Sequence, residues 1–241
     1  METAVIIAGG KGSRLAPLTL DKPKTLVEVN GKPILERILE WLKSYEIKHV
    51  VIGCADKKAQ IQQYLEKNGN FGLKIDLSED TLEGTAQAFK LAIKNYINDE
   101  YFLAMNGDEL TNLDINRLEA AYNKNKGIIT MALAPLPTKF SVIELDKEGR
   151  ITSFEYGKAL PSVLVSMGVY IFSSKILEYI PDKGSIEDLT FKKLVFEGKA
   201  YGYKLSEGEY WLSINTVKDV QEAEAALAKI DIKPARHSVK S

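Results

Sequence analysis

The sequence is poor in the residues that form disulfides and zinc sites. It contains one cysteine, Cys54, and two histidines, His49 and His237, among 241 residues. A single cysteine cannot form an internal disulfide, and no Cys/His cluster of the kind that binds zinc is present. Because Cys54 follows the apolar residues 50–52, we expect a buried structural thiol, and we expect a catalytic role for neither histidine.

Long apolar runs and an N-terminal leader are also lacking. No stretch of about 18 apolar residues occurs, so no membrane span is expected. Residues 1–8 lead directly into an apolar segment and do not show the pattern of a signal peptide. We therefore expect no membrane partner and a cytoplasmic location.

The chain has no excess of charge of one sign. It carries 32 basic and 33 acidic residues, which gives a formal net charge of −1. A nucleic-acid-binding surface needs a basic excess, so we expect no nucleic-acid partner. A balanced chain can still hold a locally basic site for a small anion.

The first half of the chain alternates short apolar runs with amphipathic stretches. Strands are expected at residues 4–8, 50–53, 73–77 and 101–105, and helices at 33–45, 57–68, 85–95 and 114–123, the last capped by Asp114. This β-α-β-α-β-α-β-α order predicts a Rossmann-like α/β fold, with a mostly parallel sheet covered by helices on both faces. Ligands bind such sheets beyond the carboxyl ends of the strands.

The order of expected strands and helices changes in the second half of the chain. Strands are expected at residues 128–134, 142–145, 151–155 and 165–172, with a hairpin turn at 146–149, and helices at 174–180, 186–197 and 216–229. These strands are expected to extend the sheet, which makes it mixed. We predict one domain over residues 1–230, with a soft boundary between halves 1–134 and 135–230, and a polar tail over 231–241.

A glycine-rich loop follows the first expected strand. Its residues are Ala8, Gly9, Gly10, Lys11, Gly12, Ser13 and Arg14. Glycines let the backbone approach a ligand closely, and the exposed N–H groups of such a loop bind anions. The loop is neither a P-loop, whose G-x-x-x-x-G-K-[ST] pattern is absent, nor a dinucleotide loop, because Leu15 stands where the third glycine would be.

A second basic segment follows at close range. Pro23 fixes its own backbone and restrains the residue before it, so Lys24 is held on a stiffened loop near the same sheet edge. A glycine cluster alone is at least as often an empty turn as a binding site. A second positioned cation beside it favours a site for a phosphorylated ligand.

Residues 8–33 resemble the opening motif of the sugar-1-phosphate nucleotidyltransferases. This family of NDP-sugar pyrophosphorylases includes the glucose-1-phosphate thymidylyl-, mannose-1-phosphate guanylyl- and heptose-1-phosphate guanylyltransferases. The matching segments are residues 8–15, Pro17-Leu18-Thr19, Pro23-Lys24 and Asn30-Gly31-Lys32-Pro33.

The resemblance implies the nucleotide-diphospho-sugar transferase fold and an enzyme that joins an NTP to a sugar 1-phosphate and releases pyrophosphate. Residues 1–134 would be the nucleotide-binding half, and residues 135–230 the sugar-binding half. The glycine loop, Ala8 to Ser13, would wrap the triphosphate, with Arg14 on the leaving pyrophosphate and Lys24 on the reacting phosphates. The resemblance also leaves a homo-oligomer open.

Two further segments of the first half fit this resemblance. Gly84 and Thr85 open a helix that Thr85 could cap, and the resemblance sets them against the nucleobase, with Glu79 in the region where the family holds a base-reading residue. Asp108 follows a buried strand and Gly107, which the resemblance sets near the sugar. Mg²⁺ prefers one or two carboxylates with phosphate oxygens and water, so Asp108 is the expected magnesium ligand. Glu109 is expected to face solvent.

The second half departs from the family pattern. Glu155 matches the family's Glu-Lys-Pro segment, but Tyr156-Gly157 replaces Lys-Pro, so that Lys158 would have to supply the charge. Ser166 stands where a sugar-binding asparagine is usual. Ser213 takes the position of the second metal aspartate, and Asn215 is a neutral candidate that would ligate the metal through its carbonyl oxygen or position water.

These departures keep alternatives open. The chain could use an altered metal shell and an unusual phosphate acceptor, such as a polyol phosphate or phosphocholine, or it could be a weakened relative that only senses a nucleotide or sugar. We favour an active enzyme because Arg14, Lys24 and Asp108 are all present. A dinucleotide-dependent oxidoreductase is disfavoured by Leu15.

Overall fold

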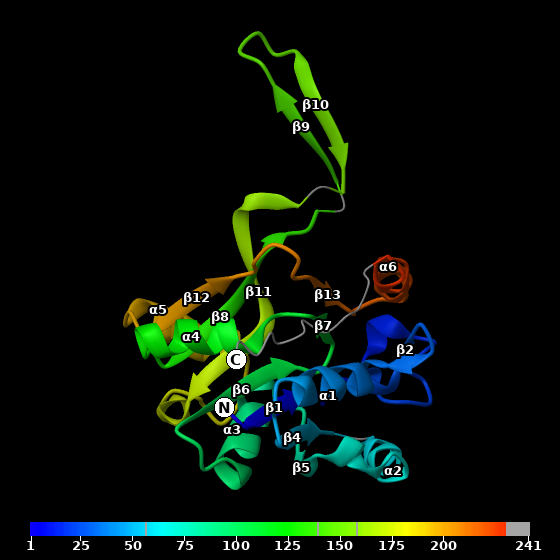
Figure 1. The fold of residues 1–241 in the computed structure, drawn as a ribbon, viewed down its shortest axis with the longest axis vertical. Helices are drawn as coiled ribbons and strands as arrows, with labels where there is room; N and C mark the ends of the chain where they lie inside the picture. Colours follow the sequence, from blue (N-terminus) through cyan, green and yellow to red (C-terminus); the bar gives the residue numbers. More distant parts are fainter. Residues whose placement is uncertain (56, 139, 158, 230–241) are drawn as a thin grey trace, which may run out of the picture.

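A seven-stranded mixed sheet forms the centre of the computed structural model, which describes residues 1–55, 57–138, 140–157 and 159–229 (Figure 1). Its strand order is β12-β8-β11-β6-β1-β4-β5, and β11 runs antiparallel to both of its neighbours while the other pairs are parallel. The strands are β1 (Thr3–Ile7), β4 (His49–Cys54), β5 (Lys74–Glu79), β6 (Tyr101–Asn106), β8 (Ile129–Leu136), β11 (Leu160–Ser173) and β12 (Ala200–Lys204).

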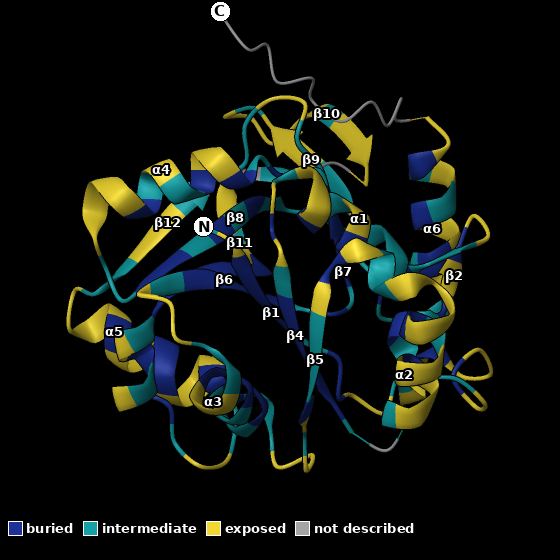
Figure 2. Ribbon diagram, turned by 60° about the horizontal axis from the view of Figure 1, so that its bottom comes forward, coloured by how far each residue is buried: buried dark blue, intermediate teal, exposed yellow. Residues whose placement is uncertain are grey.

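Helices cover both faces of this sheet, as the sequence pattern predicts. Side chains alternate between faces along a strand, so Ala4 and Ile6 of β1 enter one hydrophobic core, whereas Val5 enters the other. The first core is closed by α1 (Ile34–Ser44), α2 (Lys58–Lys67), α4 (Ile115–Asn125) and α6 (Val217–Leu227), and the second by α3 (Thr85–Tyr96) and α5 (Lys192–Phe196). Figure 2 shows the resulting layers, with buried strands between helices whose outer sides are exposed.

The expected elements of the first half are confirmed, with ends that differ by one or two residues. The carboxylate of Asp114 accepts hydrogen bonds from the backbone N–H groups of Asn116 (2.9 Å) and Arg117 (3.4 Å), so it caps α4 as expected. Small elements went unpredicted because they are two to four residues long: β2 (Glu28–Val29), β3 (Lys32–Pro33), β7 (Glu109–Thr111), β13 (Trp211–Ser213), and the 3₁₀ turns η1 (Ser13–Leu15), η2 (Lys24–Leu26) and η3 (Gly69–Gly72).

The expectation that all strands of the second half extend the sheet is wrong for two of them. Within the described part of the chain, strands β9 (Ser141–Leu145) and β10 (Ile151–Tyr156) pair only with each other, and they project from the sheet as a hairpin (Figure 1). Strand β8 ends directly before Pro137, which has no N–H group to continue a ladder. The register sets Phe154 opposite Ile143, and both side chains are exposed.

The helices expected late in the chain are shorter than the periodicity suggests. Residues 174–180 contain only a 3₁₀ helix, η4 (Ser174–Glu178), and residues 186–197 form the π-helical turn η5 (Glu187–Phe191) followed by α5. The closing helix α6 begins with a capping box, in which Thr216 and Asp219 each bind the backbone N–H of the other. None of the helices in the described ranges is long and apolar enough to cross a bilayer.

Cys54 is buried at the end of β4, which confirms the expected structural thiol. Burial raises the pKa of its thiol to about 12, so little thiolate forms in the folded protein. We expect a disulfide reagent at about pH 8 to modify Cys54 at least about 100-fold more slowly in the folded protein than in the urea-unfolded chain. Absorbance of the released thiolate measures both rates, and equal rates would contradict a buried, protonated thiol.

Candidate functional site

The carboxyl ends of β1, β4 and β6 meet at one edge of the sheet. The N–H of Ala8 donates to the Gly53 carbonyl over 2.8 Å, and the N–H of Gly107 donates to the Ile7 carbonyl over 2.8 Å. A side chain at Gly107 would lie 3.0 Å from that carbonyl oxygen and 3.0 Å from the Cγ2 atom of Thr25. Glycine at 107 therefore lets the turn that carries Asp108 pack directly against the chain leaving β1.

The glycine loop follows β1 and is exposed where a ligand would reach it. Gly9 is buried and packs against Asp80. A Cβ atom at this position would lie 1.5 Å from an Asp80 carboxylate oxygen, so a larger residue would not fit without moving that side chain. Gly12 has a left-handed backbone with φ of 64°, which favours glycine. The loop then closes in η1, whose Leu15 is fully buried. Four residues remain exposed at its surface: Gly10, Lys11, Ser13 and Arg14.

The segment that carries Lys24 is braced from two sides. The hydroxyl of Thr19 donates to the Gly12 carbonyl over 2.8 Å, which ties the segment to the glycine loop. The ammonium of Lys57 donates to the carbonyls of Thr19, Leu20 and Lys22 over 2.7 to 3.1 Å. Lys24 follows as the first residue of η2, directly after this braced segment.

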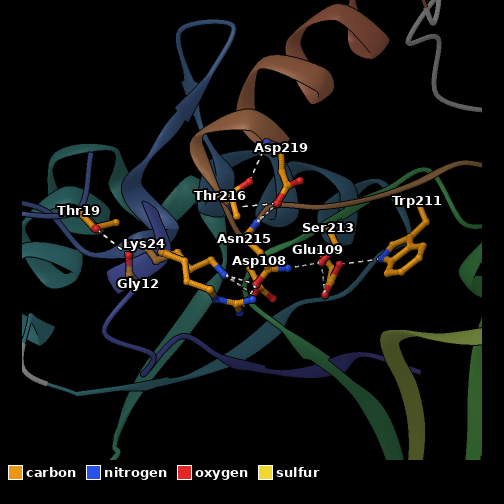
Figure 3. A network of polar contacts seen from close by, with 11 residues as sticks. Gly12, Thr19, Lys24, Asp108, Glu109, Trp211, Ser213, Asn215, Thr216 and Asp219 are labelled. Carbon is orange, nitrogen blue, oxygen red and sulfur yellow. Dashed lines mark hydrogen bonds and ion pairs between the residues drawn. The ribbon is translucent and has the colours of Figure 1, made fainter. Parts of the chain in front are cut away.

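Two cationic side chains contact a carboxylate and a side-chain amide beside these loops (Figure 3). The ammonium of Lys24 contacts Oδ2 of Asp108 at 2.5 Å and Oδ1 of Asn215 at 3.0 Å. The guanidinium of Arg14 donates to the same Asn215 oxygen over 2.9 Å. The structure thus brings together four of the residues singled out in the sequence from three distant parts of the chain.

The backbone around Asn215 is fixed by the start of α6. The N–H groups of Asn215 and Thr216 both donate to the carboxylate of Asp219, over 3.1 and 2.8 Å. The preceding N–H, from Ile214, donates to the Asp108 carbonyl over 2.9 Å. These contacts bind the end of β13 directly to the turn that carries Asp108.

Glu109 is buried, and the expectation that it faces solvent is wrong. Its side chain lies under β13, where its two carboxylate oxygens accept hydrogen bonds from Nε1 of Trp211 at 2.7 Å and from the Ser213 hydroxyl at 3.1 Å. Burial, together with the charge of Asp108, raises the pKa of Glu109 to about 8, although these donors and Lys24 act in the opposite direction. Nothing in the local sequence distinguishes it, because its partners lie about a hundred residues away.

Gly84 and Thr85 pack against a segment of the second half. A Cβ atom at Gly84 would lie 2.3 Å from the Gly184 carbonyl oxygen, so only glycine fits there. The Thr85 hydroxyl donates to Glu187 over 3.0 Å and accepts from the N–H of Ile186 over 3.0 Å. The expectation that Thr85 caps its own helix is therefore wrong, because its hydroxyl is used between the two halves of the chain.

Glu79, the other expected base-side residue, ends β5 with an exposed side chain. The next residue, Asp80, is the one that lies against Gly9 of the glycine loop. The side chain of Asp80 also accepts the N–H of Leu82 over 2.8 Å, which shapes the turn before Gly84. Asp80 is thus an acidic neighbour of the loop that the sequence pattern did not reveal.

The residues expected at the sugar are spread more widely. Glu155 is exposed on β10 of the projecting hairpin, and Lys158 lies outside the described residues. The hydroxyl of Ser166 donates to that of Tyr170 over 3.2 Å, across an irregular stretch of β11. Within that stretch, a Cβ atom at Gly168 would lie 2.8 Å from the side-chain amide of Asn106. Ser166 therefore stands close to the end of β6, just before Gly107.

No three His, Cys, Asp or Glu side chains of the described ranges cluster as a ready metal site. The oxygen atoms that do converge are Oδ2 of Asp108 and Oδ1 of Asn215, which share the ammonium of Lys24. This pair presents one carboxylate and one amide oxygen to a single cation.

Comparison with known proteins gives consistent matches over nearly the whole chain. A family model described as nucleotidyl transferase matches residues 3–230. The chain is 30% identical over 234 residues to mannose-1-phosphate guanylyltransferase of Mycobacterium tuberculosis and 27% identical over 251 residues to UTP–glucose-1-phosphate uridylyltransferase of Synechocystis. These alignments cover 94% and 95% of this chain but only 64% of each relative, so the chain spans less than two thirds of their length.

Solved structures of similar fold are also found. A putative glucose-1-phosphate thymidylyltransferase from Bacillus anthracis superposes with a TM-score of 0.75 and 22% sequence identity, over 96% of this chain and 97% of that one. The expected nucleotide-diphospho-sugar transferase fold, with its mixed and mostly parallel sheet, is therefore confirmed.

Proposed function

Since its match to the family model covers residues 3–230, the chain belongs to the nucleotidyl transferase family, and we propose that it transfers a nucleoside monophosphate from an NTP to a sugar 1-phosphate, with release of pyrophosphate. One observation carries this proposal: Lys24 and Arg14 converge on the oxygens of Asp108 and Asn215 beside an exposed glycine loop. Both relatives described above are named for a reaction of this type.

The glycine loop is proposed to bind the triphosphate. Gly10, Lys11 and Ser13 are exposed, and their backbone N–H groups are free of the sheet ladder that engages Ala8. Successive N–H groups in such a loop form a nest for phosphate oxygens. Arg14 follows on the same surface, where its planar guanidinium suits the two oxygens of a leaving pyrophosphate.

Asp108 and Asn215 are proposed to hold Mg²⁺. Their oxygens already share one cation, the ammonium of Lys24, so the donor set fits a hard divalent ion with few protein ligands. Bound there, Mg²⁺ would neutralise phosphate charge and help to align the triphosphate. Asn215 is neutral, so this pair offers one unit of negative charge, and magnesium binding is expected to be weaker than between two carboxylates.

The proposed chemistry requires positioning and charge neutralisation. An oxygen of the acceptor phosphate attacks the α-phosphorus, and the bond from that phosphorus to the pyrophosphate oxygen breaks. The acceptor is already anionic, so no general base is needed. Lys24 turns from Asp108 to the reacting phosphates and reduces their mutual repulsion, while Arg14 and the loop N–H groups stabilise the departing charge.

The contacts to the base and to the sugar form a separate part of the proposal. Gly84 and Thr85, with Glu79 at the end of β5, would border the nucleobase. Gly107 and Ser166 would border the sugar, since Gly168 near Ser166 packs on Asn106 at the same sheet edge. Glu155 and Lys158 are carried over from the family pattern alone. A homo-oligomer, a cytoplasmic location and the division at residues 134 and 135 also remain predictions from the sequence.

Pyrophosphate release tests the proposal directly. We expect Mg²⁺-dependent release when the protein is given the right one of several NTPs together with one of several sugar 1-phosphates, and no release when either substrate is omitted. A parallel panel of polyol phosphates and phosphocholine distinguishes a non-sugar acceptor. Nucleotide binding without release for any pair would contradict transfer and favour a ligand-sensing relative.

A further inference from the structure

A chain of hydrogen bonds with a single direction connects the buried carboxyl group of Glu109 to the site (Figure 3). The Asn215 amide nitrogen donates to the Ser213 hydroxyl oxygen over 2.7 Å, and that hydroxyl donates to Oε1 of Glu109 over 3.1 Å. The second carboxylate oxygen accepts Nε1–H of Trp211 over 2.7 Å. Ser213 stands directly opposite Glu109 in the pairing of β13 with β7, so the strand register sets this contact.

When Glu109 is ionised it can only accept, and the donors and acceptors in this chain then leave one orientation for the Asn215 amide. A hydroxyl group has a single hydrogen, and Ser213 uses it on Glu109, so its lone pairs face Asn215 and require the NH₂ group there. The amide oxygen then faces Lys24 and Arg14, which can only donate. The backbone N–H of Asn215 donates to Asp219, which fixes the backbone at this residue. The side-chain amide could still rotate, and its orientation must be set by other contacts.

We propose that Glu109 and Ser213 are positioning residues that keep the amide oxygen of Asn215 turned toward the cations of the site. An amide has nearly the same shape after a half-turn, so packing alone discriminates poorly between the two orientations. The reversed amide would present NH₂ to Lys24 and Arg14 and would offer no oxygen to a metal. The role of this orientation in turnover rests on the proposed nucleotidyl transfer, whereas the orientation itself does not.

The isosteric change Glu109→Gln tests the direction of the chain. Trp211 only donates, so the new amide must give its oxygen to Trp211 and its NH₂ to Ser213. The hydroxyl hydrogen of Ser213 then either loses its acceptor or turns to Asn215 and takes the amide oxygen away from the cations. We expect about 10-fold or greater loss of kcat/KM and a higher Mg²⁺ requirement, as for other groups that orient a metal ligand.

A second substitution separates direction from loss of charge. In Glu109→Gln/Trp211→Phe, the glutamine is free to turn its oxygen to Ser213, so we expect most of the lost kcat/KM to return although the charge of Glu109 is still absent. Glu109→Gln/Trp41→Phe is the matched control, because Trp41 donates to the Leu113 carbonyl outside this chain and should restore nothing. Assays at about pH 9 keep Glu109 ionised in the unmodified protein, given its raised pKa.

A readout without substrate makes the inference independent of the proposed reaction. The side-chain NH₂ signals of Asn215 in an amide NMR spectrum, assigned with Asn215→Asp, should move in Glu109→Gln and return in the Trp211→Phe double variant. If the signals stay in place in Glu109→Gln, or if Trp211→Phe and Trp41→Phe act alike on them, the inference is overturned. Signals that behave as expected in a protein that releases no pyrophosphate would instead contradict only the proposed function.

Discussion

Replacing Lys24 with alanine is expected to lower turnover by about 100- to 1,000-fold, the usual cost of removing one positioned charge donor from a site where phosphate charge develops. The ammonium of Lys24 already lies between Asp108 and Asn215, and its backbone is held by a braced segment. Without it, the two anionic phosphates would approach each other with less neutralisation. Steady-state pyrophosphate release with saturating substrates measures the loss.

The neighbouring Lys22 provides the matched control for this prediction. It lies on the same loop, its side chain is about half exposed, and its ion pair with Glu28 spans 4.0 Å at the surface. Lys22→Ala should keep turnover within about twofold, because exposed pairs contribute little. Thermal melting should show that Lys24→Ala remains folded. Near-normal turnover of the folded Lys24→Ala protein would remove this residue from the proposed chemistry.

Asp108→Asn is expected to abolish most Mg²⁺-dependent turnover, with a loss of about 100-fold or more at fixed magnesium. The variant keeps the shape of the side chain but removes the carboxylate charge that we propose as the principal ligand. With Asn215 as the other donor, two neutral amide oxygens would remain, and such a site binds a hard cation poorly. The half-saturating Mg²⁺ concentration should therefore rise together with the fall in rate.

Metal binding can be followed apart from turnover. Mn²⁺ titration, with the free ion read by electron paramagnetic resonance in the presence of nucleotide, should show weaker binding by Asp108→Asn. Asp182→Asn provides the control, since Asp182 is exposed and pairs with Lys90. Unchanged Mn²⁺ affinity in Asp108→Asn would place the metal elsewhere.

The contact between Lys24 and Asp108 has a consequence for both predictions. A lysine that neutralises the proposed metal ligand competes with the metal, so binding of Mg²⁺ and release of the ammonium toward phosphate are expected to occur together. Lys24 thereby serves two partners in sequence, first Asp108 and then the substrate phosphates. Lys24→Ala should accordingly tighten Mn²⁺ binding slightly even as it slows turnover.

The parts of the fold that follow from local patterns could be predicted from the sequence. The alternating apolar runs of the first half determine parallel strands and covering helices, and the carboxyl ends of β1 and β6 bring the glycine loop and Asp108 to one edge. The cap at Asp114 also follows from local chemistry, because the backbone N–H groups that donate to its carboxylate are only two and three residues away.

Features that depend on distant pairing could not be predicted in this way. Glu109 follows Asp108 on a three-residue strand, and only the pairing of β7 with β13 shows that it is buried beneath Trp211 and Ser213. Thr85 is a reasonable helix cap by sequence, but its hydroxyl binds residues about a hundred positions later. The hairpin leaves the sheet after Pro137, although its strands have ordinary strand character.

A crystal structure with Mg²⁺ and a non-hydrolysable NTP most directly tests the claim that this sheet edge binds a triphosphate. We predict that the phosphates lie on residues 9–14, that the metal contacts Asp108 and Asn215, and that Lys24 has moved from Asp108 to a phosphate oxygen. A nucleotide bound elsewhere, with the contact between Lys24 and Asp108 intact, would contradict the account.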